Sequence, residues 1–74
     1  MKITGAIREV MKMQGVGTNK MADRMNRPPR FVSDRLRLEN ISFEKADEML
    51  RLLDYKIVIV PREARVPEGG FEIE

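Results

Sequence analysis

Cysteine and histidine are both missing from the 74 residues of this sequence. Without cysteine there is no disulfide frame, no thiolate chemistry and no zinc-finger spacing. Without histidine the chain lacks the most common proton shuttle and the most common metal ligand. Few side chains carry an aliphatic hydroxyl, and none has a residue suited to activate it: Thr4, Thr18, Ser33 and Ser42. We therefore expect no enzymatic activity, no cofactor and no metal site.

Long apolar runs are absent as well. No segment approaches the roughly 20 apolar residues that a membrane-spanning helix needs, and the beginning of the chain has no signal-peptide apolar region. We expect a cytoplasmic protein that does not contact a membrane. A chain of this length buries only about 60% of the surface that its unfolded form exposes, so we expect one small domain whose core benefits from a partner subunit.

The charged residues are distributed unevenly. Residues 1–37 contain nine lysines and arginines and three acidic residues, a net charge of +6, whereas residues 38–74 contain five basic and nine acidic residues, a net charge of −4. A basic half favours a polyanionic partner such as nucleic acid. Scattered solvation of surface charges explains the same numbers equally well, because a nucleic-acid interface requires basic residues clustered on one face.

The first part of the chain predicts two helices. Apolar residues with helical spacing follow Thr4, a suitable N-cap, and Gly15 is suited to end this helix in a left-handed conformation. Thr18 is the predicted cap of a second, short helix that ends at Met25. Asn26 tolerates the left-handed conformation, and the two prolines after it cannot continue a helix but can open one.

Two more helices are predicted beyond these prolines. The third begins near Pro29 and runs to Leu38, and Ser42 caps a fourth that reaches about Leu53. The side chains expected to be buried in the fourth helix are Phe43, Ala46, Met49, Leu50 and Leu53. The methionines expected to fill the core are Met11, Met13, Met21, Met25 and Met49.

The pattern then changes from helical to extended. Ile57 to Val60 are four β-branched residues in succession, and Pro61 stops the run. The sequence therefore predicts a β-strand over residues 56–61 with apolar side chains on both faces. Residues 62–74 have the composition of a tail, in which the alternating residues 71–74 are compatible with a second short strand.

One face of the predicted third helix is entirely polar. On a helical wheel it presents Arg30, Ser33, Asp34 and Arg37, and apolar residues occupy the other side. Arginine can donate two hydrogen bonds to guanine, aspartate can accept one from cytosine, and serine can do either. Any surface helix has a polar face, so this pattern alone does not distinguish a DNA-binding helix from a solvated one.

The second and third helices together are more specific. Ala22, Asn26 and Val32 stand where two sharply crossing helices need a small residue, a left-handed turn residue and a β-branched plug. Residues 18–36 resemble the helix-turn-helix of the Cro/phage-repressor (XRE) family, and residues 40–61 resemble small bacterial regulators of that family that end in a hydrophobic strand. The likeness covers residues 3–61 and departs from the family at residues 26–29, where Asn-Arg-Pro-Pro replaces the usual glycine, apolar residue, serine or threonine, and glutamine.

This resemblance implies a mostly α fold, a lambda-repressor-like bundle of four or five short helices with a C-terminal β-strand or hairpin. Residues 1–55 would form a helix-turn-helix DNA-binding domain, residues 56–61 the strand and residues 62–74 the tail. The implied function is that of a sequence-specific transcriptional regulator that binds double-stranded DNA, a repressor of mobile-element or prophage type. The residues implied to face the bases are Arg30, Ser33, Asp34 and Arg37. Those implied to contact phosphates are Thr18, Asn19, Lys20, Arg27 and Asn40.

An apolar strand with an unprotected edge needs a pairing partner. The candidates are its counterpart in a second subunit, the tail strand 71–74 and the N-terminal Lys2 and Ile3. We favour a homodimer through Ile57, Val58, Ile59 and Val60, because the core is small and repressors of this type bind palindromic sites. The alternative function is a protein-interaction module, antitoxin-like or a co-regulator, in which the polar face is only solvated.

Overall fold

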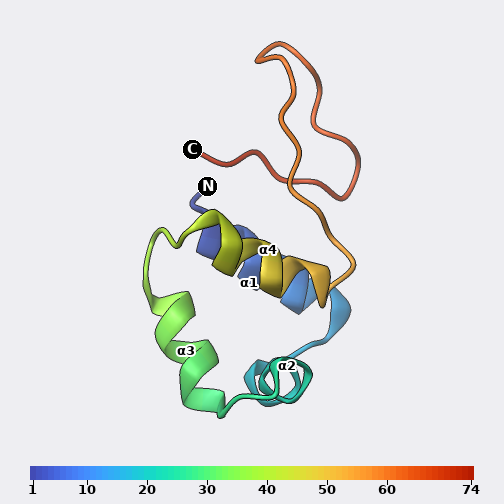
Figure 1. Cartoon of the computed structure of the whole chain (residues 1–74). Helices are drawn as coiled ribbons and strands as arrows, with labels where there is room; N and C mark the ends of the chain where they lie inside the picture. The colour runs from blue at the N-terminus through green and yellow to red at the C-terminus, as the bar shows by residue number, and fades with distance from the viewer.

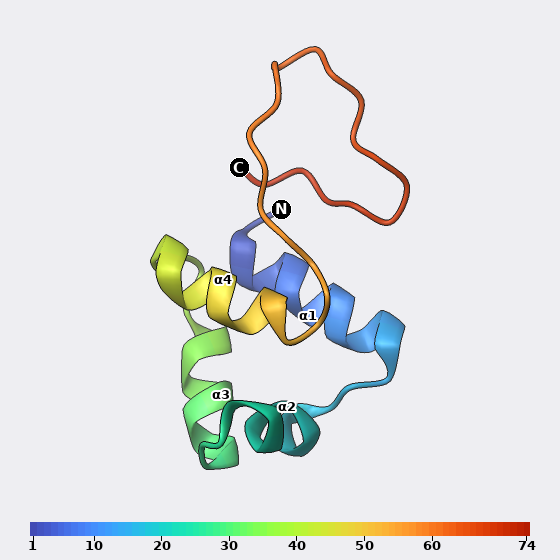
Figure 2. The same ribbon diagram turned by 45° about the vertical axis from the view of Figure 1, so that its right-hand side comes forward.

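The computed structural model describes the whole chain, residues 1–74, and contains four helices and no strand. α1 packs against α3 and α4, and α2 packs against α3 (Figure 1). The helices α2 and α3 form one end of the molecule, and the C-terminal tail extends from the other end (Figure 2). The prediction of four short helices is confirmed, and no fifth helix follows. Their bounds are α1 (Ile3–Gln14), α2 (Thr18–Met25), α3 (Pro29–Arg37) and α4 (Phe43–Arg51).

The helix ends follow the local chemistry at most of the predicted points. Gly15 ends α1 with φ 68°, in the left-handed region where glycine has no Cβ to clash. α3 opens at Pro29, where the missing N–H needs no partner. The hydroxyl of Ser42 caps α4 by accepting a hydrogen bond from the backbone N–H of Lys45 at 3.3 Å.

Two predicted caps are wrong. α1 begins at Ile3, so Thr4 lies inside the helix, and its buried side chain serves a contact between helices that is described below. α2 begins at Thr18 itself, and the residue before it, Gly17, has no side chain with which to cap the helix. In each case the hydroxyl lies one or two residues beyond the cap position, which sequence patterns do not locate more closely than that.

The core is formed by apolar side chains from all four helices. The largest fully buried side chains are Ile7, Val10, Met21, Val32, Met49 and Leu53. Two predicted core residues are instead exposed. Met13 is 57% exposed because it points away from the arc of α1 that holds Ile7 and Met11. Phe43 lies in the first turn of α4, before the buried part of that face begins at Ala46.

The predicted strands at residues 56–61 and 71–74 are absent from the chain. Residues 56–60 are followed by a turn in which the N–H of Ala64 donates to the carbonyl of Pro61 at 3.0 Å. The tail then returns to the helices, where the hydroxyl of Tyr55 donates to the carbonyl of Gly69 at 2.6 Å. At the end of the chain the N–H of Glu74 donates to the carbonyl of Met1 at 3.0 Å. With the tail held by these hydrogen bonds, no other segment lies beside residues 56–60 as a strand. A segment without a partner strand cannot form a sheet.

The helices are short. None of them has both the length and the apolar composition required to cross a membrane.

Candidate nucleic-acid interface

The candidate interface is built on the turn between α2 and α3. Asn26 adopts the left-handed conformation with φ 56° and ψ 46°, and the N–H of Arg27 donates to the carbonyl of Ala22 at 3.0 Å. This closure ends α2 and redirects the chain, so that α3 crosses α2 steeply (Figure 1). Ala22 and Val32 are both fully buried. The predicted small residue, turn residue and β-branched plug therefore occupy the positions that the crossing requires.

The outer face of α3 projects away from the body of the protein. The side chain of Arg30 is 90% exposed, that of Arg37 is largely exposed and that of Asp34 is half exposed. Asp34 lies between the two arginines: its carboxylate is 3.7 Å from Nε of Arg30 and accepts a hydrogen bond from Arg37. The structure therefore brings together three of the four predicted base-facing residues as one charged cluster on one helix face.

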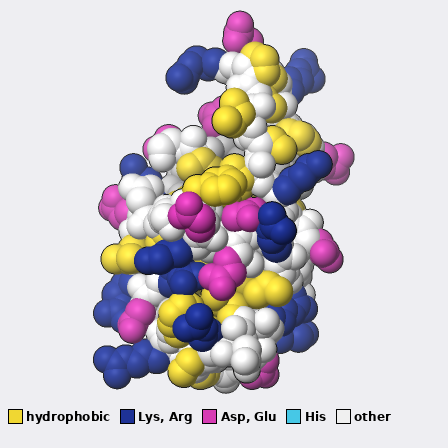
Figure 3. All heavy atoms as spheres, in the orientation of Figure 1, with side chains coloured by type: hydrophobic (Ala, Val, Ile, Leu, Met, Phe, Trp, Pro, Cys, Tyr) yellow, Lys and Arg dark blue, Asp and Glu magenta, His cyan; other side chains and the backbone are white.

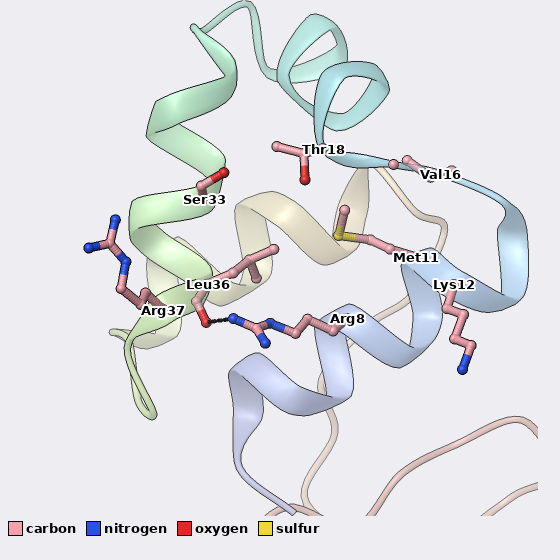
Figure 4. A pocket seen from close by; sticks show the side chains of 9 residues that line it. Arg8, Met11, Lys12, Val16, Thr18, Ser33, Leu36 and Arg37 are labelled. Atoms are coloured by element: carbon pink, nitrogen blue, oxygen red, sulfur yellow. Dashed lines mark hydrogen bonds between the residues drawn. The ribbon is translucent and has the colours of Figure 1, made fainter.

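The fourth predicted residue, Ser33, lies at the edge of this face. Its hydroxyl points toward Thr18 across a surface groove that α1, the start of α2 and α3 enclose (Figure 4). The groove has a volume of about 450 Å³, and Arg8, Lys12 and Arg37 contribute basic side chains to its lining. Ser33 is therefore better placed to contact the border of a bound polyanion than its centre.

Arg8 and Lys12 were not among the predicted site residues. They come from α1, outside the two crossing helices, and their approach to α3 is a tertiary feature. Their spacing of four residues on the polar side of a basic helix was the available sequence signal. On the face drawn in Figure 3, lysine and arginine side chains also lie on both flanks of the end formed by α2 and α3.

The start of α2 offers backbone donors beside this groove. In α2, the first N–H that bonds to a backbone carbonyl is that of Met21, which donates to Gly17 at 3.0 Å. The N–H groups of Thr18, Asn19 and Lys20 are therefore left without helical partners. The positive end of the helix dipole adds to their attraction for anions. Asn19 and Lys20 are exposed and Thr18 is half-buried. These three predicted phosphate contacts are therefore adjacent in space.

The other two predicted phosphate contacts lie apart from this group. Arg27 is in the turn, where its guanidinium stacks 4.8 Å from the centre of the Phe31 ring. The guanidinium of Arg35 lies 4.4 Å from the same ring and pairs with Glu48 of α4 at 2.7 Å. Asn40 is exposed in the loop beyond the opposite end of α3. Arg27 and Asn40 thus flank the two ends of α3, and Arg35 has a structural role.

Side chains of α1 hold the C-terminal end of α3 in place. Nη2 of Arg8 donates to the carbonyl of Leu36 at 2.7 Å (Figure 4). The buried hydroxyl of Thr4 lies 2.6 Å from the carbonyl of Leu38 and 3.0 Å from that of Glu39, and its single proton serves these two acceptors. The last carbonyls of a helix have no partner within it, so Arg8 satisfies one of them, at Leu36, and Thr4 fixes the chain where it leaves α3.

Thr4→Val tests this anchor. Valine keeps the shape of threonine but cannot donate, so the carbonyls of Leu38 and Glu39, just beyond α3, lose a hydrogen bond. We expect the free energy of unfolding to fall by about 1–2 kcal/mol, measured by urea denaturation. Thr18→Val, which removes a hydroxyl with no hydrogen bond of its own, should change it by less than about 0.5 kcal/mol. Equal stability of Thr4→Val and the wild type would contradict this role.

Comparison with known proteins assigns the chain to no family. No protein-family model, curated protein or solved structure matches the chain. Within the structure, no three acidic side chains converge as a metal site would require. What remains on this end of the molecule is an exposed helix with one acceptor between two guanidinium donors, next to a basic groove and the free N–H groups of α2.

Proposed function

We propose that the protein is a sequence-specific regulator that binds double-stranded DNA through a lambda-repressor-like helix-turn-helix. α3 would lie in the major groove and the start of α2 would contact a phosphate. The observation that carries the proposal is the outward-facing cluster of Arg30, Asp34 and Arg37 on a helix that crosses its neighbour at a tight left-handed turn. The resemblance to the Cro/phage-repressor family supports a repressor of mobile-element or prophage type.

The two kinds of contact have separate origins on the surface. Arg30, Asp34 and Arg37 can hydrogen-bond to base edges, which distinguish one sequence from another. Lys20 and the N–H groups at the start of α2 can bind phosphate, which is the same in every sequence. Arg8 and Lys12 extend this phosphate-binding surface along the groove. Binding would therefore combine affinity from α1 and α2 with specificity from α3.

We further propose that the protein acts as a homodimer joined by residues 56–60. None of the backbone N–H or C=O groups of this segment is hydrogen-bonded to another backbone group. From Ile57 to Val60 its side chains are apolar, and Ile59 is 99% exposed. An extended apolar segment with free backbone groups favours pairing with a second strand. The same segment of a second copy can supply that strand in antiparallel orientation.

Charge favours one register for this pairing. If Val58 lies opposite Val58 of the second copy, Ile57 faces Ile59 and Asp54 lies near Arg62 of the second copy. A shift that centres the pair on Ile59 instead places Lys56 opposite Arg62, which is repulsive. To bind a palindromic site, such a dimer would have to present its two α3 helices to half-sites about 34 Å apart, one turn of DNA.

The alternative is a protein-interaction module. It is favoured by one observation, that Asp34 already pairs with both Arg30 and Arg37 and partly neutralises the face. In that case the cluster would be a solvated surface, and a duplex would bind weakly if at all. The two hypotheses differ in whether the outer face of α3 governs binding to DNA.

Two substitutions distinguish them, with binding to duplexes of different sequence measured by fluorescence anisotropy over a range of salt concentrations. Lys20→Ala should weaken binding to all sequences alike and reduce the salt slope by about one. Arg30→Ala should weaken binding to the preferred site by about 1–3 kcal/mol and relax the preference at one position. Lys45→Ala, which removes an exposed charge from α4, is the control. If Lys20→Ala and Arg30→Ala both bind like this control, the DNA-binding proposal fails.

A further inference from the structure

The spacing of the charged cluster on α3 sets the length of DNA that it can contact. Arg30, Asp34 and Arg37 are separated by four and three residues within one unbroken helix. At about 1.5 Å per residue, the first and last lie roughly 10.5 Å apart along the axis. Successive bases along a strand are about 3.4 Å apart, so a helix parallel to the DNA axis would cover about three base-pair steps, and one inclined along the major groove about two.

The chemistry of the three side chains restricts which bases they can recognise. A guanidinium is only a donor, and in the major groove its fork fits the two acceptors of guanine. An ionised carboxylate is only an acceptor, so at Asp34 it favours the amino group of cytosine and repels the acceptors of guanine and thymine. Two-point recognition of adenine requires the amide of Asn or Gln, and the outer face of α3 has neither.

The contacts within the cluster orient the two arginine side chains before any ligand binds. Asp34 binds Arg30 on one side and Arg37 on the other, so the carboxylate holds both guanidinium groups along the line of the helix. Side chains already oriented by a neighbour lose less conformational freedom when they bind. The same carboxylate keeps free acceptor positions for a base, because each of its oxygens can accept more than one hydrogen bond.

The geometry points to a G·C-rich half-site, with guanines opposite Arg30 and Arg37 about two or three base-pair steps apart and a cytosine amino group opposite Asp34 between them. This inference rests on the proposed DNA-binding function and adds to it the class of sequence that is recognised. It assigns Asp34 the role of a specificity determinant that selects against guanine and thymine at the middle position.

Selection from random duplex DNA by the full-length protein tests the inference, with Asp34→Asn selected in parallel. The wild type should enrich two guanines at this spacing with a cytosine between them. Asparagine presents a donor and an acceptor that match adenine. Asp34→Asn should therefore change the middle preference from cytosine to adenine by about tenfold or more, and the flanking guanines should persist.

Asp47→Asn is the matched control, because Asp47 also pairs with an arginine four residues away on its own helix, at 2.8 Å, but lies in α4. It should select the same sequences as the wild type. An enriched site without the paired guanines, or a middle preference that Asp34→Asn leaves unchanged, would overturn the inference while DNA binding stands. Failure of the wild type to retain or enrich any duplex would instead overturn the proposed function itself.

Discussion

Ile7→Ala is expected to lower the free energy of unfolding by about 2–5 kcal/mol, the largest effect on stability that we predict for a single substitution. Ile7 is fully buried in α1, where the surrounding helices cannot collapse freely around a lost side chain. At about 0.05–0.15 kcal/mol per residue, a chain of this length has a total stability of roughly 4–11 kcal/mol. The substitution therefore removes a large share of what holds α1, α3 and α4 together.

Met13→Ala is the matched control for this experiment. Met13 lies in the same helix but is exposed, so its truncation should change the unfolding free energy by no more than about 0.5 kcal/mol. Urea denaturation followed by circular dichroism measures both variants. Equal destabilisation by the two substitutions would mean that the packing of α1 differs from the arrangement described.

Ile59→Lys is expected to prevent dimerisation, the largest effect that we predict on function. A lysine on each copy would place two charges within the proposed apolar strand pair, where like charges repel. The isolated chain should keep its helices, because the side chain of Ile59 makes almost no contact with the rest of the molecule. Affinity for DNA with two half-sites should fall on the order of 100-fold, because linked binding of two sites is lost.

Sedimentation equilibrium and titration of one-site and two-site duplexes measure the two effects separately. Val66→Lys places the same charge on another exposed apolar residue of the tail, outside residues 56–60, and should leave the dimer intact. Affinity for a single half-site should be the same for both variants and the wild type. A wild-type protein that remains a monomer at high micromolar concentration would rule out this mode of assembly.

The helices could be predicted from the sequence because their ends depend on local chemistry. Gly15 and Asn26 adopt the left-handed conformation as their residue types indicated, and Pro29 opens α3. These residues act through their own backbone and the next few positions, which a sequence displays directly. Thr4 shows the limit: its hydroxyl serves the end of α3, a contact with residues more than thirty positions away.

The tail could not be predicted in the same way. The β-branched residues from Ile57 to Val60 have a strong preference for strands, but a strand also requires a partner, and the chain provides none at that position. Composition indicates which secondary structure a segment favours. The path of the tail depends instead on the hydrogen bonds of Tyr55 and Glu74 to distant residues. The strand preference of residues 57–60 therefore has no partner strand within the chain.

The candidate site was predicted in part. The periodicity of α3 correctly placed Arg30, Asp34 and Arg37 on an exposed face, because burial of Val32 and Leu36 fixes the rotation of the helix. The groove was missed, because its walls come from three helices whose mutual approach no spacing rule supplies. The periodicity of the sequence thus identifies the exposed face of α3, whereas the groove beside that face depends on how the helices pack.

The left-handed turn at Asn26 also limits how the protein can change during evolution. A residue with φ 56° carries a steric penalty for most side chains, so only glycine, asparagine and aspartate are tolerated there without strain. Homologues that keep the crossing of α2 and α3 should therefore draw on this small set at that position. The exposed charges of α3 carry no such restriction. If the proposed DNA-binding function holds, descendants can therefore change the sequence they recognise by altering that face while the turn beneath it stays the same.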